Sequence, residues 1–385
     1  MKCYKIEIDP TKKQRELMHK HFGVCRFVYN LYLSENKKRY DGGDKFFSGY
    51  DCSKWLNNDF IPNNPSYSWI KEVGSKAVKK SIMDAETAYR KFFKGESKHP
   101  RYKNKNSRKS FYFPRNNATD LLIERYRGKI PKFGFVRFKE YGYAPVGRNA
   151  VSVTVSYIAG RYYASYLFNE EAQCAVLGDK SEGIGIDLGV KDFAIVSNGR
   201  KFKNVNKTSK MKKLKKKLKR KQRAFSRKLI KNKKGKNIIY TANMVKDKKA
   251  IAKLYASLSR KRIEYVRYVV NSLVKANSLP EYVSIENLNV RGMLKNKHLS
   301  DAIKQQLFNY FRQYLIERCS KLSVPVRIIG RYYPSSKMCS KCGIVNKALK
   351  LSDRVFRCPK CGYTADRDEN ASLNIRNCET YDLAC

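Results

Sequence analysis

Acidic side chains occur at three places in the sequence where they could bind a divalent cation. Asp187 lies in the apolar, glycine-flanked run Gly185-Ile186-Asp187-Leu188-Gly189, a pattern typical of a buried strand. A lone carboxylate in such a strand would cost on the order of several kcal/mol. A bound cation would offset this cost, and divalent cations in proteins take more than one carboxylate. Asp187 therefore predicts partner acids elsewhere in the chain.

Two further segments supply candidate partners. Glu286 ends a β-branched run that begins at Tyr282, and Asp366, Asp368 and Glu369 stand at a predicted helix start. Acids at a helix start are commonly caps, so the last segment alone does not indicate a site. One acid from each of three elements in an α/β domain is, however, typical of a two-Mg²⁺ site. Its metals, about 3.5–4 Å apart, activate a water and stabilise the leaving oxygen of a phosphodiester. Hard oxygen ligands favour Mg²⁺ or Mn²⁺ over zinc.

A second metal site is predicted from cysteine spacing. Two Cys-x-x-Cys pairs, each followed by glycine, are separated by 15 residues, which is within zinc-ribbon spacing. Four thiolates fill a tetrahedral coordination shell, so this zinc would be structural. Four unrelated thiols are the alternative, and this spacing disfavours it. The other seven of the 11 cysteines are scattered, which fits a reducing compartment rather than a disulfide framework. The predicted zinc ligands are Cys339, Cys342, Cys358 and Cys361.

The charge of the chain points to a polyanionic partner. Lys and Arg number 83 against 33 Asp and Glu, a net charge of +50, and 27 Tyr and 19 Phe could stack on bases. Nucleic acid explains this combination better than a basic ribosomal or membrane-surface protein does. No apolar run approaches the roughly 18 residues of a membrane span, and the N-terminus lacks a signal-peptide pattern. We expect a soluble, intracellular protein with no membrane partner.

Two basic segments are candidate nucleic-acid contacts. The stretch 98–106 interleaves a tyrosine with basic residues, and the region from Phe193 to Lys246 contains no Asp or Glu. Solvated charged faces usually mix both signs, so an all-positive helix favours an anionic partner over a merely solvated surface. The candidate contacts are Arg101, Tyr102, Lys103, Lys212, Lys215, Lys216, Lys219, Arg220 and Arg223.

The segments around the acids and cysteines predict the elements that position them. A three-strand meander is expected from Asp187 onward, with a two-residue hairpin turn at Asn198-Gly199. An acid in the first strand of such a meander, followed by helices, is the opening typical of an RNase H-type domain. Apolar periodicity then predicts three helices and a last strand, at about 211–229, 247–277, 299–323 and 324–329.

The first half of the chain predicts a helical unit and a β region. A strand at 3–9 precedes a capping box that begins at Thr11 and predicts a helix start. A second helix is predicted at about 78–92, and the Gly-, Asn-, Asp- and Pro-rich stretch 41–66 is predicted to be mostly loop. Period-two alternation predicts a mostly β region at 96–178, which the first strand could join.

At these motifs the chain strongly resembles the TnpB (OrfB) proteins of bacterial insertion sequences, relatives of the type V CRISPR effectors. Phe22–Asn30 resembles the N-terminal motif of that family, often described as helix-turn-helix, and Pro100–Lys103 resembles its "PRFK" motif. The runs Gly185–Gly189, Ile285–Leu288 and Asp366–Ala371 resemble its three split RuvC motifs. The cysteine ribbon is similar to the zinc domain before the last motif.

The resemblance implies a multidomain α+β fold. A helical unit and a β-rich, wedge-type barrel domain would precede an RNase H-like (RuvC) α/β domain with an inserted zinc ribbon. The resemblance implies a first wedge strand at 1–10, a helical recognition domain at 11–95 and the rest of the wedge domain at 96–180. The first part of the RuvC-like domain would follow at 181–330, the zinc ribbon at 331–364 and the last part of the RuvC-like domain at 365–385.

The resemblance also implies an RNA-guided DNA endonuclease encoded by a transposable element and commonly described as a transposase. Its catalytic and Mg²⁺-binding acids would be Asp187, Glu286 and, by motif position, Asp368 rather than Asp366. The partners would be a guide RNA from the element end and double-stranded target DNA with a short flanking motif, and a monomer is expected. The protein would lie in the cytoplasm of a prokaryotic cell, at the nucleoid when bound to DNA. The alternatives are a nuclease-inactive, RNA-guided DNA-binding regulator on the same fold and an RNA-independent resolvase of branched DNA. The three intact acids disfavour the regulator.

Overall fold

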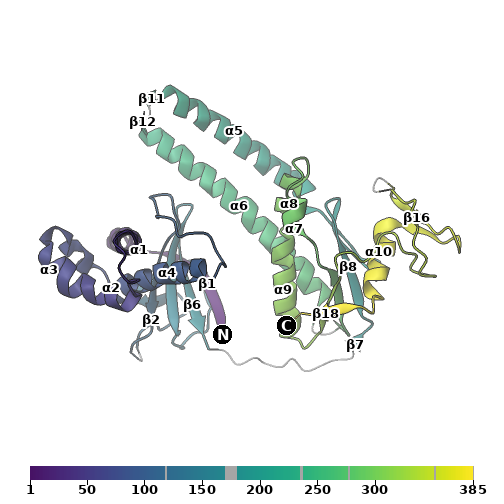
Figure 1. The fold of residues 1–385 in the computed structure, drawn as a ribbon, viewed down its shortest axis with the longest axis horizontal. Helices are drawn as coiled ribbons and strands as arrows, with labels where there is room; N and C mark the ends of the chain where they lie inside the picture. Colours follow the sequence, from purple (N-terminus) through teal and green to yellow (C-terminus); the bar gives the residue numbers. More distant parts are fainter. Residues whose placement is uncertain (118, 170–179, 235–236, 276–277, 351–352, 385) are drawn as a thin grey trace. The chain divides into compact units, whose positions relative to one another are not determined.

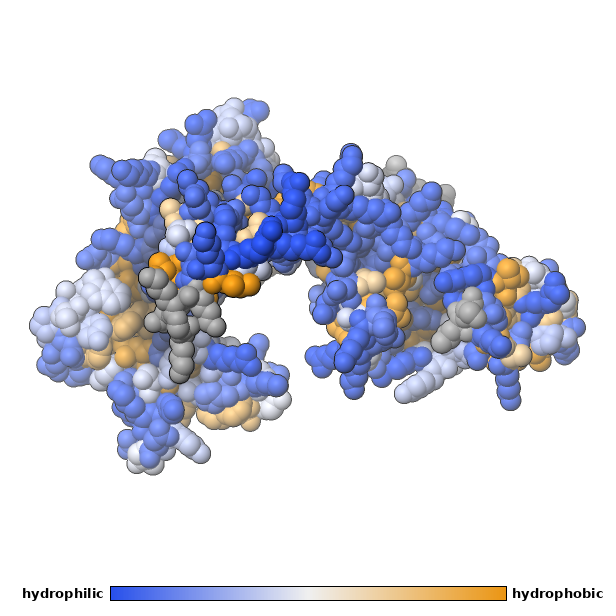
Figure 2. Space-filling view, turned by 90° about the horizontal axis from the view of Figure 1, so that it is seen from above, coloured by the Kyte–Doolittle hydropathy of each residue, from blue (hydrophilic) through white to orange (hydrophobic). Residues whose placement is uncertain are grey.

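The computed structural model describes residues 1–384 except 118, 170–179, 235–236, 276–277 and 351–352. The chain divides into two compact units, Met1–Glu171 and Ala172–Cys385, which are described separately. Both contain a six-stranded sheet and helices, so the predicted multidomain α+β class is confirmed. Hydrophilic residues cover most of the face seen in Figure 2, with hydrophobic residues in small separate patches. No helix in the described ranges has the length and apolarity needed to span a membrane.

The first unit is built on an antiparallel sheet in the order β2-β5-β6-β1-β4-β3. The N-terminal strand pairs with β6 on one side and β4 on the other, so it does join the sheet. The hairpin between β5 and β6 turns through Ala159 and Gly160, both at positive φ. The strands are β1 (Lys2–Asp9), β2 (Lys109–Pro114), β3 (Arg127–Ile130), β4 (Gly134–Phe138), β5 (Ser152–Ile158) and β6 (Arg161–Phe168).

Two long helices of this unit follow the predicted patterns. In α1 (Lys12–Asp41), Thr11 and Gln14 form the predicted capping box. An apolar stripe along this helix is buried, because it packs against the sheet and against α4 (Ser75–Phe93). The stripe consists of Met18, Phe22, Cys25, Tyr29 and Tyr32.

The prediction that residues 41–66 are mostly loop is wrong. Short helical segments fill much of this stretch, and their aromatic side chains pack around α1 and α4. The burial of these side chains outweighs the low helix propensity of the surrounding Gly, Asn and Pro residues. The segments are α2 (Gly49–Trp55), the π-helical turn Leu56–Phe60, α3 (Ile61–Asn63) and the 3₁₀ segment Pro65–Glu72.

The second unit contains a mixed sheet in the order β10-β9-β8-β14-β15-β18. The predicted meander is present as three antiparallel strands, and Gly199 has a φ of +82° in its turn. Strands β8, β14 and β15 are parallel neighbours, whereas β18 pairs antiparallel with β15. The bounds are β8 (Ile184–Leu188), β9 (Asp192–Val196), β10 (Lys201–Lys203), β14 (Val283–Glu286), β15 (Val326–Ile329) and β18 (Tyr381–Leu383).

Helices cover both faces of this sheet (Figure 1). Apolar residues of α6 (Ala242–Leu273) and α9 (Phe308–Ser320) form one core with the strands, while α10 (Arg367–Arg376) packs against β8 from the other face. The helix predicted at 299–323 is in fact two, because Leu307 adopts the left-handed conformation, at φ +59°, between α8 (Ser300–Gln306) and α9. Of the predicted helix 247–277, residues 276–277 lie outside the described part of the chain.

The remaining elements are mostly short. Helix α5 (Ser209–Lys231) packs along α6 through Met211, Leu218 and Leu258. The cysteine segment carries the hairpin β16 (Val355–Arg357) and β17 (Thr364–Asp366), which leads directly into α10. The others are β7 (Lys180–Ser181) paired with β13 (Leu279–Pro280), β11 (Lys233–Lys234) paired with β12 (Asn237–Ile238), the 3₁₀ turn Val205–Lys207 and α7 (Val290–Met293).

Candidate active site and zinc centre

The three predicted acids line one open pocket of about 600 Å³ in the second unit. Asp187 and Glu286 lie at the carboxyl ends of the parallel neighbours β8 and β14. Each directly follows a member of the cross-strand pair Ile186 and Ile285, so the two carboxylates project from adjacent positions at one edge of the sheet. Ligand sites of α/β sheets are commonly found at this edge.

Asp368 enters the pocket from the first turn of α10, whereas Asp366 has another role. The Asp366 carboxylate caps this helix and accepts hydrogen bonds from the backbone N–H groups of Asp368 at 3.0 Å and Glu369 at 3.2 Å. Asp366 is not among the residues that line the pocket, but Asp368 is. The geometry therefore favours Asp368 as the third acid, in agreement with the choice made from motif position.

Gly185 permits the helix that carries Asp368 to approach the strand that carries Asp187. A Cβ atom added at Gly185 would lie 2.2 Å from the carbonyl oxygen of Ser372 and 2.4 Å from the backbone nitrogen of Arg376. Both contacts are to helix backbone, which cannot rotate away. The glycine thus brings α10 close enough to β8 for the acids to share a pocket.

Gly185→Ala is therefore expected to displace α10 and to lower the free energy of unfolding by at least about 2 kcal/mol. The midpoint of thermal unfolding of the purified protein measures the effect. Gly330→Ala is the matched control, because a Cβ atom there would meet nothing within 4 Å, and a change below about 0.5 kcal/mol is expected. Equal midpoints for the two variants would contradict this account of the close approach.

Two carboxyl groups of the pocket, those of Asp187 and Glu286, resist ionisation in the absence of a cation. Removal from water, reinforced by the charges of Glu286 and Asp368, raises the pKa of Asp187 from 3.8 to about 8. Burial also raises the pKa of Glu286, although the Ser335 hydroxyl, which donates to its Oε1 at 2.5 Å, opposes that shift. A divalent cation would remove this mutual repulsion, so the donor set fits a hard, oxygen-liganded metal.

The pocket also contains cationic side chains that the sequence did not single out. Arg354 and Arg367 lie 3.8 and 3.4 Å from the carboxylate oxygens of Asp368, and Lys191 and Lys207 line the same pocket. Arg354 reaches it because the β16–β17 hairpin folds back, with the Arg367 N–H donating to the Arg354 carbonyl. Arg367 could have been noticed beside the acidic motif, but no sequence pattern marks Arg354.

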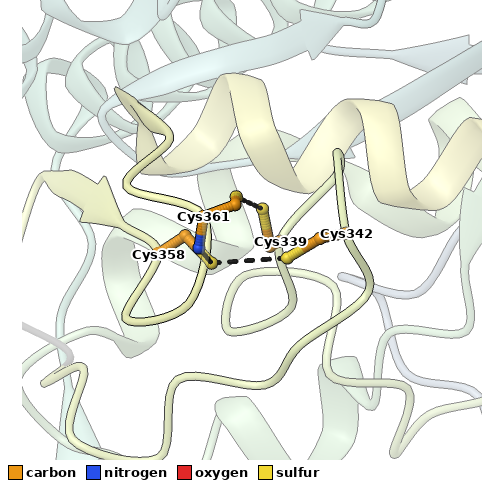
Figure 3. A group of neighbouring side chains, drawn as sticks. All are labelled: Cys339, Cys342, Cys358 and Cys361. Carbon is orange, nitrogen blue, oxygen red and sulfur yellow. Dashed lines mark hydrogen bonds between the residues drawn. The ribbon is translucent and has the colours of Figure 1, made fainter.

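The four predicted cysteines converge in the second unit, as Figure 3 shows. All four Sγ atoms lie within 4.8 Å of one another, with 3.6 Å between Cys339 and Cys361 and 3.4 Å between Cys342 and Cys358. Gly343 and Gly362, which follow the second cysteine of each pair, have positive φ, and this conformation allows a tight turn around the cysteines. Four thiols at these separations are compatible with a single structural zinc ion.

The predicted basic loop is fixed to α1 in the first unit. Asn30 holds the backbone of Lys103 by two hydrogen bonds of 2.8 Å, and the Lys103 ammonium group lies 3.5 Å from the centroid of the Tyr29 ring. Burial lowers the pKa of Lys103. Arg101 and Tyr102 are exposed. Within this motif, Lys103 thus anchors the loop, and its two neighbours face solvent.

The predicted basic helix, α5, presents most of its candidate contacts to solvent. Five of the six are exposed, whereas Lys215 is partly buried, donates to the Asn206 carbonyl at 3.4 Å and has a pKa lowered by burial. Asp247 on α6 pairs with Lys221 and Lys228. The exposed candidates are Lys212, Lys216, Lys219, Arg220 and Arg223.

Comparison with known proteins gives three family-model matches and relatives along the whole chain. The models are described as "Helix-turn-helix domain" (residues 1–45), "Probable transposase" (177–297) and "Cas12f1-like, TNB domain" (308–375). A protein of Streptomyces pristinaespiralis named "Putative RNA-guided DNA endonuclease" is 30% identical over 97% of this chain and 88% of its own length. The chain belongs to the TnpB (OrfB) family.

A second relative of this TnpB-family chain, "Putative RNA-guided DNA endonuclease InsQ" of Escherichia coli (strain K12), is 28% identical over 100% of this chain and 94% of its own length. Among solved structures, a Cas12f1–sgRNA–target DNA complex contains a chain of similar fold, with a TM-score of 0.56 and 14% identity, covering 95% of this chain and 83% of that one. The likeness supports a Cas12-like multidomain fold.

The residue ranges of two family matches can be compared with the helices and strands of the structure. The match described as helix-turn-helix covers β1 and α1, so in this TnpB-family chain residues 1–45 form a strand and one 30-residue helix. The TNB match runs from α9 through the cysteine cluster to Ile375 in α10 and includes Asp368. One family module thus contains both the four clustered cysteines and the third acid of the pocket.

Proposed function

We propose that this protein is an RNA-guided DNA endonuclease encoded by a transposable element, with a RuvC-like site made by Asp187, Glu286 and Asp368. The observation that carries the proposal is the convergence of these acids, distant in sequence, in one pocket of a TnpB-family chain. The sheet order and the strand-end positions of the acids support an RNase H-like domain with the ribbon inserted before its last part, at 331–364.

Two Mg²⁺ ions are the cofactors that fit this pocket, with Mn²⁺ as a substitute. When bound, they would activate a water and stabilise the leaving oxygen of the scissile phosphodiester. Asp187, Glu286 and Asp368 would hold them, and Ser335 would orient the Glu286 carboxylate through its hydrogen bond. Arg354 and Arg367 would leave Asp368 and offset the charge of the incoming phosphates. One zinc in the cysteine ribbon would be structural.

The partners in this proposal are a guide RNA from the element end and a DNA duplex that carries a short motif beside the target, bound by a protein monomer. The excess of 83 basic over 33 acidic residues supports polyanionic partners. The exposed basic face of α5 would contact the guide–target heteroduplex, and Arg101 and Tyr102 would contact nucleic acid near α1. A nuclease-inactive regulator is not favoured, because all three acids are present in the pocket.

The direct test is cleavage by the protein purified from its host locus together with its copurified RNA. The RNA is sequenced, and plasmids that match its variable end are incubated with the complex and Mg²⁺. Double-strand cleavage of matched plasmids alone is expected. Binding of the matched plasmid without cleavage would support the regulator, whereas cutting of branched DNA without RNA would support a resolvase.

The raised pKa of Asp187 predicts how metal binding depends on pH. Its folded-state pKa, about 8, lies above the ordinary value of 3.8, so the metal-free fold favours the protonated acid and loses this stabilisation as pH rises through about 8. Mg²⁺ requires the carboxylate, so its stabilising effect should grow over the same range. The increase in unfolding midpoint on adding Mg²⁺ is expected to be larger at about pH 9 than at about pH 6. An Asp187→Asn variant should lose most of this pH dependence, and equal Mg²⁺ shifts at both pH values in the wild type would contradict the prediction.

A further inference from the structure

Three exposed tyrosines lie in the segments that flank strands β3 and β4 of the first unit. Tyr126, Tyr141 and Tyr143, here called the tyrosine platform, have exposed fractions of 53, 54 and 54%. The rings of Tyr126 and Tyr141 meet edge to face with centroids 5.0 Å apart, and Tyr143 meets the buried Tyr4 in the same way at 5.5 Å. Neighbouring aromatic side chains that are about half exposed indicate an interaction surface.

Backbone hydrogen bonds hold the platform in place. The Phe138 N–H donates to the Tyr126 carbonyl at 2.7 Å, and the Gly142 N–H donates to the Arg125 carbonyl at 3.2 Å. The loop that carries Tyr141 and Tyr143 is thus joined to the segment that carries Tyr126. Since the rings stand on a fixed backbone, little conformational freedom would be lost when a partner binds.

Each platform tyrosine keeps more than half of its surface exposed. A polar side chain would cost less at such positions. These side chains therefore contribute aromatic surface that a partner can use.

The segment that carries the platform is basic, which favours an anionic partner. Residues 124–148, which include the β3–β4 hairpin, contain seven Lys and Arg and two Glu. Two of the basic residues are paired, Arg127 with Glu124 at 2.6 Å and Lys139 with Glu7 at 3.2 Å. The Arg125 guanidinium lies 5.5 Å from the centroid of the Tyr126 ring. Aromatic rings interleaved with cationic groups are the common means of binding unpaired nucleotides, because bases stack on the rings while cations contact the phosphates.

We infer that the tyrosine platform binds a single-stranded stretch of the guide RNA by stacking unpaired bases on Tyr126 and Tyr141. This inference rests on the proposed function for the identity of the RNA. A DNA duplex fits less well, because its base faces are covered by their neighbours, whereas a folded RNA offers loops and ends with free base faces. Arg125 and Arg148 would contact the phosphates beside the stacked bases.

The test compares stacking-competent and stacking-deficient variants of the full chain. The double alanine variant, Tyr126→Ala/Tyr141→Ala, loses both aromatic rings. The double phenylalanine variant, Tyr126→Phe/Tyr141→Phe, keeps both rings and shows whether the fold tolerates substitution at these positions. Tyr332→Ala, at a tyrosine 91% exposed in the second unit, is the distant control. Fluorescence anisotropy measures Kd for single-stranded oligoadenylate RNA of about 15 nucleotides and for an RNA duplex of the same length, in about 0.3 M salt to limit non-specific binding.

We expect the double alanine variant to bind the single strand at least about tenfold more weakly. The double phenylalanine variant and Tyr332→Ala should stay within about twofold of wild type, and duplex affinity should change less than about twofold throughout. Unchanged single-strand affinity in the alanine variant, or an equal loss for both probes, would overturn the inference. The proposed function has its own test, because it fails if the wild-type chain copurifies no element RNA. The comparison with oligoadenylate does not depend on that result and can still be made.

Discussion

Asp187→Asn is expected to lower the rate constant for cleavage of a matched target by at least about a thousandfold, because the variant loses a carboxylate shared by the proposed metal ions. Affinity for the copurified RNA should change less than about twofold, since none of the predicted basic contacts on α5 lines the pocket of Asp187. The fold should tolerate the change, because asparagine has nearly the same shape and removes a charge that the pocket resists. Single-turnover cleavage and RNA-binding assays measure the two effects.

Asp366→Asn is the matched control for this experiment. It is the same substitution at an acid of the proposed third RuvC-like motif, and asparagine is as good a helix N-cap as aspartate, so α10 should remain capped. Cleavage by this variant is expected within about threefold of wild type. Full cutting by Asp187→Asn would refute the metal-site assignment, and loss of activity in Asp366→Asn would mean that the third acid has been misassigned.

The positions of Asp187 and Glu286 could be predicted because local patterns contain the necessary information. Each acid ends or interrupts a short apolar run, such runs become buried strands, and the carboxyl ends of parallel strands meet at one edge. The close approach at Gly185 could not be predicted, since the backbone that it accommodates lies in α10, almost two hundred residues later. The position of Arg354 beside Asp368 could not be predicted either, because only the pairing of β16 with β17 brings the two residues together.

The errors elsewhere also have a physical origin. Residues 41–66 have the composition of a loop, but Trp55 and Phe60 pack in an aromatic cluster against α1 and α4, and that burial stabilises short helices of low propensity. The break at Leu307 interrupts an apolar pattern that continues on both sides. Lys103 shows that a basic residue in a nucleic-acid motif can be committed to packing, which composition alone does not reveal.

Loss of the zinc is expected to unfold the ribbon and to displace Asp368, the third acid of the pocket. A structural zinc contributes about 10–16 kcal/mol of apparent binding free energy to such a module, whereas the apolar core around the cysteines contains little more than Leu349, Phe356 and Tyr363. Cys358→Ser should therefore reduce bound zinc below about half an equivalent per chain. Elemental analysis measures the metal, and limited proteolysis between residues 337 and 364 reports the unfolding.

Cleavage should also fall, by at least about tenfold, because β17 continues directly into the helix of Asp368 and the hairpin supplies Arg354. Cys3→Ser, at an exposed cysteine outside the ribbon, is the control and should retain both metal and activity. A Cys358→Ser protein that kept a full equivalent of zinc and resisted proteolysis would refute the four-cysteine site. A zinc-free protein with normal cleavage would instead show that α10 holds Asp368 without the ribbon, through its packing at Gly185 alone.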